Sequence, residues 1–450
     1  MKQLWHRPDF LKLWGGETLS LFGSQVTVLA LPLTAILTLH ATPAQLGLLG
    51  AARYAPFLLV TIFVGVWVDH HRRRPILMGA NLGRAILLGL IPLTVALGVL
   101  RIEYLYVIAF LVGVLQVFFD LAYRAFLPSL VPRDQLIQAN SRLEASSSSA
   151  EIGGPALGGF LVQLLTAPFA ILVDAASFLI SLGSLLLIRA KEPGLVSAPN
   201  GGRRKLWDEI RSGLRYTFGN PSLRAIGLEA ATYNLFETLI LTLFMVYAVR
   251  QLGVSSSTLG LMLAAGSVGA LLGSLVAQVI ERRWGFGPTL IASMVLACTA
   301  FLLIPLVHGA IIPVVSILIV AFFLNGIGLS ISSIQAVSLR QLITPDQLLG
   351  RVNASYLLVV YGAMPLGALL GGTLGSWLGL RTALLIGACC LPLALVWVVF
   401  SPLRRLRTLD HLIVSQEAAP SSETLAPSLE GAYSHAHHNK ERARSVSNES

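Results

Sequence analysis

The stretch "GVWVDHHRRRPI", residues 65–76, places an acid, two histidines and three arginines between two apolar runs. Each flanking run is long enough to cross a hydrocarbon core of about 30 Å as a helix. Basic residues accumulate in the cytoplasmic loops of membrane proteins, so the arginines indicate on which side this connection lies. The stretch therefore predicts a membrane protein with a cytoplasmic turn between two spans.

The rest of the chain has the composition of a membrane protein. Of its 450 residues, 55% are hydrophobic and 12% are charged, and the mean hydropathy is +0.74. A soluble chain carries about 25% charged residues. The apolar runs predict an all-α membrane protein with twelve transmembrane helices. We place the spans at 12–39, 44–68, 75–99, 104–126, 137–165, 168–189, 223–249, 257–280, 287–307, 311–338, 352–378 and 381–401.

Basic residues recur at every second connection between these spans. They follow span 4 (Arg133), span 8 (Arg282 and Arg283) and span 10 (Arg340 and Arg351), whereas the alternate loops carry few. This pattern predicts a multi-pass protein of the cell (inner) membrane with both termini in the cytoplasm. The net charge of +10 then reflects topology and does not indicate nucleic-acid binding. We expect no removable signal peptide.

The chain also contains an internal repeat. "LVPRDQLIQANS" (130–141) before span 5 is similar to "LITPDQLLGRVNAS" (342–355) before span 11. Such repeats are typical of transporters built from two similar bundles around a central path. We expect a monomer with these parts: an N-terminal six-helix bundle (1–189), a cytoplasmic linker with an amphipathic helix (190–222), a C-terminal six-helix bundle (223–402) and a disordered cytoplasmic tail (403–450).

Two motifs carry a family resemblance. Gly65, Asp69, Arg73 and Arg74 match the span 2–3 signature G-x-x-x-D-R-x-G-R-R, with His70 and Arg72 at its other two fixed positions. "GPALGG" (154–159) matches the end of the antiporter signature G-x-x-x-G-x-x-x-G-P-x-x-G-G, through Gly154, Pro155, Gly158 and Gly159. The chain resembles the major facilitator superfamily, in particular its drug- and siderophore-exporting branch, which includes macrolide efflux proteins and the enterobactin exporter.

The resemblance implies the major facilitator fold, two pseudo-symmetric bundles of six helices. It also implies that Asp69 and the neighbouring arginines form a latch at the cytoplasmic gate. The chain departs from the branch in span 1, where Ser24 and Gln25 replace the usual acidic context.

Span 5 has a face of small residues. They recur every four positions, at Ser146, Ala150, Gly154 and Gly158. Such a face allows another helix to approach closely. Pro155 has no N–H group, so the carbonyl of Glu151 loses its helical partner and a bend is expected there. Ordinary packing with a proline kink is one interpretation; we favour a conformational role linked to export.

Ionisable residues also lie within the spans. A charge near the bilayer centre costs at least about 2.5–3.5 kcal/mol, so such groups usually face a cavity or a partner. The deepest by count are Glu151, Glu237, Arg53 and Arg84. We expect Arg53 to pair with Glu151 or Asp174, in either a structural or a coupling role. Five others lie nearer the span ends, where they can reach headgroups or water: Glu17, Asp120, Glu144, Asp174 and Glu229.

Span 7 carries a polar stripe. Glu229, Tyr233 and Glu237 are spaced i, i+4 and i+8, and Asn234 lies beside them. The resemblance implies that spans 1, 4, 7 and 10 line the cavity, so the stripe is expected to face the substrate path. We favour proton coupling or binding of a cationic substrate over a structural pair with an arginine.

Spans 4 and 10 supply the remaining candidates. In span 4, Asp120 shares a face with Gln116 and Arg124, and we expect an Asp120–Arg124 pair. In span 10, Asn325 and Gln335 are candidates for substrate contact.

Several chemistries are excluded by the sequence. The chain has no G-x-x-x-x-G-K-[ST] motif, no nucleophile–base arrangement and no metal-ligand cluster. Cys298, Cys389 and Cys390 lie in apolar spans and are expected to be small core residues. We therefore predict a protein that is not an enzyme and needs no cofactor or metal.

The predicted function is secondary transport. The protein is expected to export amphipathic small molecules, drug-, macrolide- or siderophore-like, in exchange for protons by alternating access. Its partners would be the small-molecule substrate, protons and the lipid bilayer. The alternatives are a facilitator or uptake transporter of a small metabolite, or a lipid-handling protein or receptor on the same scaffold.

Overall fold

The computed structural model describes residues 7–190 and 202–407. These residues form helices and turns and contain no strand, in agreement with the all-α prediction. The Gly/Pro-rich start of the predicted linker and the predicted tail beyond residue 407 lie outside the described residues.

Every predicted span coincides with a helix or a pair of helices. The elements are α1 (Pro8–Leu37), α2 (Pro43–Leu59), α3 (Thr61–Asp69), α4 (Arg73–Ala96), α5 (Ile102–Leu130), η2 (Arg133–Gln135), α6 (Leu136–Leu165), α7 (Ala167–Leu186), α8 (Gly202–Gly219), α9 (Pro221–Arg250), α10 (Ser256–Trp284), α11 (Phe286–Leu306), α12 (Ile311–Ile343), α13 (Asp346–Leu378), α14 (Leu380–Cys390), α15 (Leu393–Val399) and η3 (Pro402–Arg405).

Within the described residues, ten of the twelve spans are long and apolar enough to cross a membrane by length and composition alone, and the twelfth span is formed by α14 and α15 together. The other two are the second span, which is divided into α2 and α3, and the fifth span, α6. The division follows a proline: Pro56 has no N–H to donate within α2, and the helix ends three residues later. α6 is too polar because it carries four consecutive serines and Glu151.

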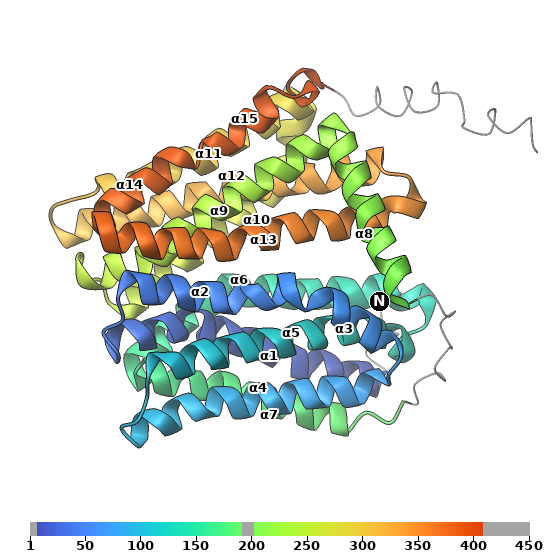
Figure 1. Ribbon diagram of the computed structural model, residues 1–450, viewed down its shortest axis with the longest axis horizontal. Helices are drawn as coiled ribbons and strands as arrows, with labels where there is room; N and C mark the ends of the chain where they lie inside the picture. The colour runs from blue at the N-terminus through green and yellow to red at the C-terminus, as the bar shows by residue number, and fades with distance from the viewer. Residues whose placement is uncertain (1–6, 191–201, 408–450) are drawn as a thin grey trace, which may run out of the picture. The chain divides into compact units, whose positions relative to one another are not determined.

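The helices pack as two sets. In the first set α1 packs on α6 and α7, α4 packs on α5 and α7, and α2 packs on α5. In the second set α9 packs on α13, α14 and α15, and α12 packs on α10 and α11. The sets meet along two seams, one between α2 and α13 and the other between α6 and α10; the second set lies above the first in Figure 1.

Glycines bring the two sets into backbone contact at one end of each seam. A Cβ atom added to Gly47 of α2 would lie 2.8 Å from the Cα atom of Gly372 in α13. A Cβ added to Gly159 of α6 would lie 3.0 Å from the Cα of Gly260 in α10. Side chains at these positions would force the seams apart, so glycine is needed for the close approach. We call this the glycine end of the molecule.

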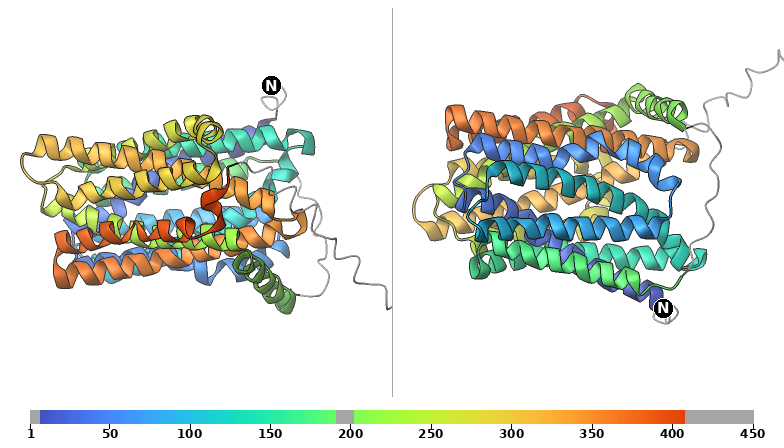
Figure 2. Two further views of the ribbon diagram at one scale, coloured as in Figure 1. Left: turned by 90° about the horizontal axis from the view of Figure 1, so that it is seen from above. Right: turned by 60° about the horizontal axis from the view of Figure 1, so that its bottom comes forward.

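The opposite end carries the basic turn between α3 and α4, and we call it the basic end. α8 crosses this end of the bundle (Figures 1 and 2) and packs on α13. Tyr216 Oη donates a hydrogen bond to the Ile343 carbonyl at 3.1 Å. Gly213 allows α8 to approach the Arg351 carbonyl, which a Cβ atom would meet at 2.6 Å. The linker helix is thus attached to the second set.

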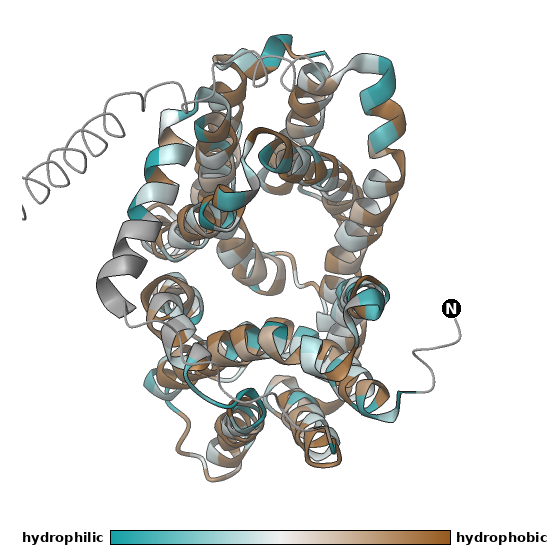
Figure 3. Ribbon diagram, turned by 90° about the vertical axis from the view of Figure 1, so that its right-hand side faces the viewer, coloured by the Kyte–Doolittle hydropathy of each residue, from teal (hydrophilic) through white to brown (hydrophobic). Residues whose placement is uncertain are grey.

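Many large apolar side chains are exposed on the outside of the molecule, and hydrophobic residues, brown in Figure 3, occur in helices all around the bundle when it is viewed from the basic end. Trp377, for example, is 83% exposed. A surface of this kind suits contact with lipid acyl chains. Cys298 is buried as predicted, whereas Cys389 is exposed on α14 and Cys390 is half-buried. The prediction is wrong for Cys389 because a helix that faces lipid is apolar on its outer side too, so an apolar span does not show which residues are in the core.

We expect an Ala44→Cys/Ser376→Cys pair to cross-link when the three native cysteines are replaced. The two residues lie beside the Gly47–Gly372 contact, where the Ala44 N–H donates a hydrogen bond across the seam to Ser376 Oγ at 3.0 Å, so two cysteine side chains there are close enough for a disulfide. Cross-linking after mild oxidation is measured by mass spectrometry of the membrane-embedded protein.

The matched control is Gly65→Cys with Gly350→Cys, at the basic end of the same seam, because neither glycine has a neighbouring atom within 4 Å of an added Cβ. Equal cross-linking of the two pairs, or none at the glycine end, would contradict the closed glycine end.

Candidate functional site

The polar stripe of span 7 lies inside the second set. Tyr233 is 1% exposed and Glu229 is 5% exposed. Asn325 of α12 donates through Nδ2 to Tyr233 Oη at 2.7 Å and to the Ala297 carbonyl at 3.0 Å. Glu237 interacts with the Tyr233 hydroxyl from the next turn of α9. Two residues predicted separately, Tyr233 and Asn325, are therefore in direct contact.

One expectation for span 7 is wrong. Glu229 does not reach headgroups or water, because it is buried and α9 lies in the interior of the second set. Asn234, beside the stripe, donates through Nδ2 to the Ala230 carbonyl of its own helix at 2.8 Å.

The carboxylates of this stripe lack a counter-charge. Among the described residues, no Lys or Arg nitrogen lies within 4.0 Å of Glu229 or Glu237. Arg340, a buried arginine of α12, lies instead over the ring of Tyr356, at 3.5 Å from its centre. An uncompensated buried charge is strongly unfavourable. A structural ion pair therefore does not explain why carboxylates occupy these positions.

A second polar network surrounds Arg84 in the first set. Arg84 is 2% exposed, and it donates to Gln116 Oε1 of α5 and to Asn81 Oδ1 of its own helix. Its guanidinium lies 4.4 Å from the ring centre of Phe119 and 4.1 Å from that of Phe178. Neutral acceptors and aromatic faces therefore hold this cation.

Three carboxylates from three helices surround Arg84 at longer range. Glu17 of α1, Asp120 of α5 and Asp174 of α7 are close enough to interact with its charge, but none lies within 4.0 Å. Asp174 is 1% exposed and accepts from the Ser177 hydroxyl at 3.3 Å. The expectation that Asp174 reaches headgroups or water is therefore wrong, whereas Glu17 and Asp120 are half-buried.

The predicted Asp120–Arg124 pair does not form within 4.0 Å. Asp120 instead accepts a hydrogen bond from Gln116 Nε2 at 2.8 Å. Gln116 lies one turn away on the same face, and it bridges Asp120 to Arg84. The prediction that Gln116 and Asp120 share a face is correct. The arginine that this face contacts, however, is Arg84 of α4 and not Arg124.

A cavity of about 190 Å³ lies between the two sets near the glycine end. α1, α2, α9 and α10 line it, mostly with aliphatic side chains, and its polar lining comprises Arg53, Tyr54, Thr238 and Thr242. Neither predicted partner of Arg53, Glu151 or Asp174, lies within 4.0 Å of it. Arg53 belongs to the α2–α13 seam, whereas Glu151 belongs to α6 in the other seam.

The small-residue face of α6 packs on α1. A Cβ atom on Gly154 would lie 2.4 Å from Gln25 Cβ, and one on Gly158 would lie 3.2 Å from Val26 Cα. Ser146 Oγ accepts a hydrogen bond from Trp14 Nε1 at 2.9 Å. The predicted close helix approach is present, and Gln25, the departure from the branch pattern, lies directly against it.

A neighbouring face of α6 points across the seam to α10. It includes Pro155, whose carbonyl meets a Cβ added to Gly260 at 2.3 Å, and Gly159. α6 continues as one helix through Pro155. Glu151 lies one turn before Pro155 on this face, and its side chain is exposed.

The predicted gate motif lies at the turn between α3 and α4. Arg74 donates through Nε to the Leu185 carbonyl at 3.0 Å and through Nη2 to the Leu186 carbonyl at 3.1 Å. These bonds join the start of α4 to the carbonyl end of α7, where a cation is favourable. Gly65 and Arg73 lie on either side of the turn, and the side chain of Asp69 lies outside what the structure describes.

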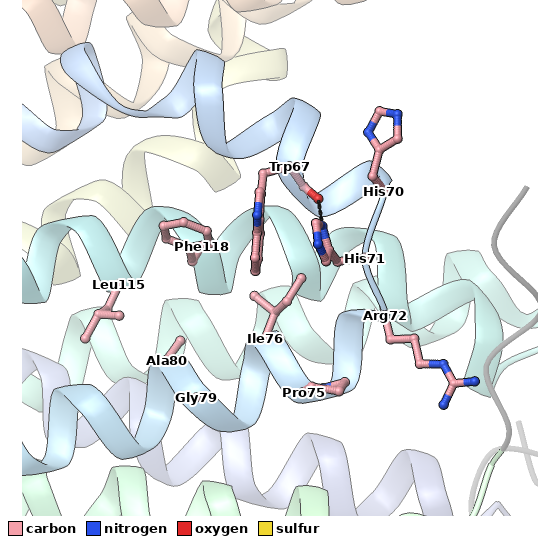
Figure 4. A pocket seen from close by; sticks show the side chains of 10 residues that line it. All are labelled: Trp67, His70, His71, Arg72, Pro75, Ile76, Gly79, Ala80, Leu115 and Phe118. Atoms are coloured by element: carbon pink, nitrogen blue, oxygen red, sulfur yellow. Dashed lines mark hydrogen bonds between the residues drawn. The ribbon is translucent and has the colours of Figure 1, made fainter. Parts of the chain in front are cut away.

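An apolar groove of about 570 Å³ lies beside this turn (Figure 4). Trp67 stacks on His71 with ring centres 4.1 Å apart and meets Phe118 edge to face at 5.3 Å. His70 and Arg72 of the turn also line the groove. The stacked rings hold the turn against α5.

The chain matches the model of the transmembrane secretion effector family over residues 5–429. It belongs to this family of the major facilitator superfamily. The superfamily consists of membrane transporters and not of enzymes, so the chain is a multi-pass membrane transporter of small molecules.

Curated relatives of the chain include efflux proteins. The chain is 27% identical to the multidrug efflux pump Tap of Mycolicibacterium fortuitum, over 86% of this chain and 94% of Tap. It is 23% identical to macrolide efflux protein A of Streptococcus pyogenes, over 88% of this chain and 97% of that protein.

A solved structure supports the same fold. A bacterial homologue of the iron transporter ferroportin, in an inward-facing state, matches with a TM-score of 0.70 at 19% identity, over 89% of this chain and 99% of that one.

We expect Arg84→Gln to lower the stability of the protein by about 3–5 kcal/mol, because it leaves the buried Asp174 and the half-buried Glu17 and Asp120 without a nearby cation. Adding Asp120→Asn should restore part of the loss, since it removes one of the three uncompensated charges. Thermal unfolding of the purified protein in detergent measures both effects. Arg124→Gln, at an exposed position of α5, is the matched control, and a loss equal to that of Arg84→Gln would contradict the assigned network.

Proposed function

We propose that this transporter exports amphipathic small molecules across the cell (inner) membrane in exchange for protons, as a monomer working by alternating access. Two relatives are efflux proteins by name, which supports the direction of transport. The basic end and both termini would lie in the cytoplasm, because basic residues gather at that end.

The seams support alternating access. The glycine contacts close the path at the end assigned to the outside, and the central cavity lies directly inside them. Opening both seams there while closing the basic end would turn the cavity toward the other side of the membrane. The gate would consist of Gly65, Asp69, Arg73 and Arg74 at the basic end, with Gly154, Pro155, Gly158 and Gly159 in the moving seam.

Glu237 carries the proposal of proton coupling. It lies in the middle of α9, directly before Thr238 of the cavity wall. It interacts with the Tyr233 hydroxyl, and no described cation lies within 4.0 Å of it. Glu237 is half-buried, and a charged carboxylate held away from water is costly, whereas a protonated one is not. Glu237 would therefore hold a proton while the path around it is closed and release it when the path opens to water.

Other side chains would support this step. Tyr233 and Asn325 would orient the Glu237 carboxyl group through the hydroxyl that connects them. The remaining proposed coupling or substrate contacts are Glu229, Asn234, Asp120, Glu151 and Arg53.

Glu237→Gln should reduce proton-driven export to the level of empty liposomes while substrate binding stays measurable. The amide keeps the shape and polarity of the side chain but cannot exchange a proton at neutral pH. The protein is reconstituted in liposomes that contain a pH-sensitive dye, a pH gradient is imposed, and a panel of amphipathic compounds is added.

Glu103→Gln is the matched control, because Glu103 is an exposed carboxylate at the start of α5. Wild-type export by Glu237→Gln would remove Glu237 from the coupling step. Movement of a compound without protons in the wild type would instead favour a facilitator.

A further inference from the structure

The cavity near the glycine end carries an unbalanced positive charge. Of its described lining residues, Arg53 is the only charged one. Its guanidinium lies 5.6 Å from the centre of the Tyr54 ring, and no described carboxylate lies within 4.0 Å of it. A cation near the centre of a membrane helix costs at least about 2.5–3.5 kcal/mol. Among the described residues, no negative charge next to Arg53 offsets this free energy.

The other polar groups of the lining do not compensate Arg53. The Thr242 hydroxyl donates its hydrogen to the Thr238 carbonyl at 2.7 Å, and the Thr238 and Tyr54 side chains are neutral. Glu237 precedes Thr238 in α9 but is not among the lining residues. The cavity thus presents the N–H donors of one guanidinium to a ligand, so a complementary ligand supplies acceptor oxygens and negative charge.

The shape of the site fits a ligand with an anionic end and an apolar body. A guanidinium binds a carboxylate or another oxyanion through two parallel hydrogen bonds. Gly50 lies one turn before Arg53 in the same wall, where an added Cβ would lie 2.9 Å from Ala368 Cβ and 3.8 Å from Thr242 Oγ1. Glycine therefore allows α13 to pack closely against α2 beside the cavity, and the aliphatic side chains of α1 and α9 form much of the remaining lining.

We propose that this cavity selects amphipathic organic anions. Arg53 binds the anionic oxygen atoms, and the aliphatic walls bind the apolar body. The inference rests on the proposed function, since it names the substrate class of the same transport path. It goes beyond that function because it predicts that cationic amphiphiles are disfavoured by the charge of Arg53.

Binding to the purified full chain tests this selectivity. Three fluorescent probes share one naphthyl-alkyl body and end in a carboxylate, a primary amide or a trimethylammonium group. We expect the carboxylate to bind about ten- to a hundredfold more tightly than the amide, because a hydrogen bond to a charged group is worth about 1.5–3 kcal/mol. The trimethylammonium probe should bind most weakly.

Variants at position 53 assign the selectivity to the guanidinium. In Arg53→Gln the three affinities should fall within about threefold of each other, which corresponds to less than 1 kcal/mol. Arg53→Lys should keep part of the preference, since it retains the charge without the planar fork. Arg101→Gln, at an exposed arginine outside the cavity, should leave the preference unchanged.

Two results would overturn the proposal: tighter binding of the trimethylammonium probe, or an unchanged carboxylate preference in Arg53→Gln. If Arg53→Gln does not fold, the order of the three probes on the wild type decides, and an amide that binds as well as the carboxylate overturns it.

Transport of the same probes in proteoliposomes separates this inference from the proposed function. Selective carboxylate binding without any transport supports the anion site and contradicts export. Transport of the trimethylammonium probe alone supports export and contradicts the anion site.

Discussion

Backbone contact between the two helix sets at the glycine end is the constraint on which the other features depend. Gly47 meets Gly372, and Gly159 meets Gly260, at distances that no side chain would allow. These contacts hold α2 against α13 and α6 against α10, and they place the cavity directly inside a closed end. Because small residues join the seams without interlocking side chains, the same seams can separate at low cost, as a rocking transporter requires.

The two sets differ in the partners that surround their ionisable side chains. In the first set Arg84 contacts two amide oxygens and two aromatic rings, and three carboxylates surround it at longer range. In the second set Glu229 and Glu237 have no described cation within 4.0 Å. The first network contains a cation that offsets part of the charge of its three carboxylates, whereas the described residues of the second contain no cation within 4.0 Å, so the second is neutral only when protons are bound. This difference is why we assign coupling to α9 and a structural role to Arg84.

The helices could be predicted from the sequence because apolar length depends on local composition alone. The stripe of Glu229, Tyr233 and Glu237 followed from helical spacing for the same reason. The Arg84 network could not be predicted, because its members lie on α1, α4, α5 and α7 and only packing brings them together. The depth of Asp174 and Glu229 was misjudged, since counting residues from a loop does not show which side of a helix faces the interior. The i, i+4 spacing of Asp120 and Arg124 permitted a pair, but Gln116 provides the observed partner.

The proposed roles of Arg53 and Glu237 would have an electrical consequence. Arg53 lies on α2 in the first set and Glu237 on α9 in the second, so opening the path would separate the proposed anion-binding group from the proposed proton-binding group. An organic anion that leaves the cell while a proton enters moves two positive charges inward. Each charge gains about 2.3 kcal/mol per 100 mV of membrane potential, negative inside. Export of an anion is therefore driven by the potential as well as by the pH gradient, whereas a monovalent cation exchanged for one proton would gain from the pH gradient alone. The single guanidinium of Arg53 would thus determine which molecules bind in the cavity. Through the charge of those molecules, it would also determine whether the membrane potential contributes to their export.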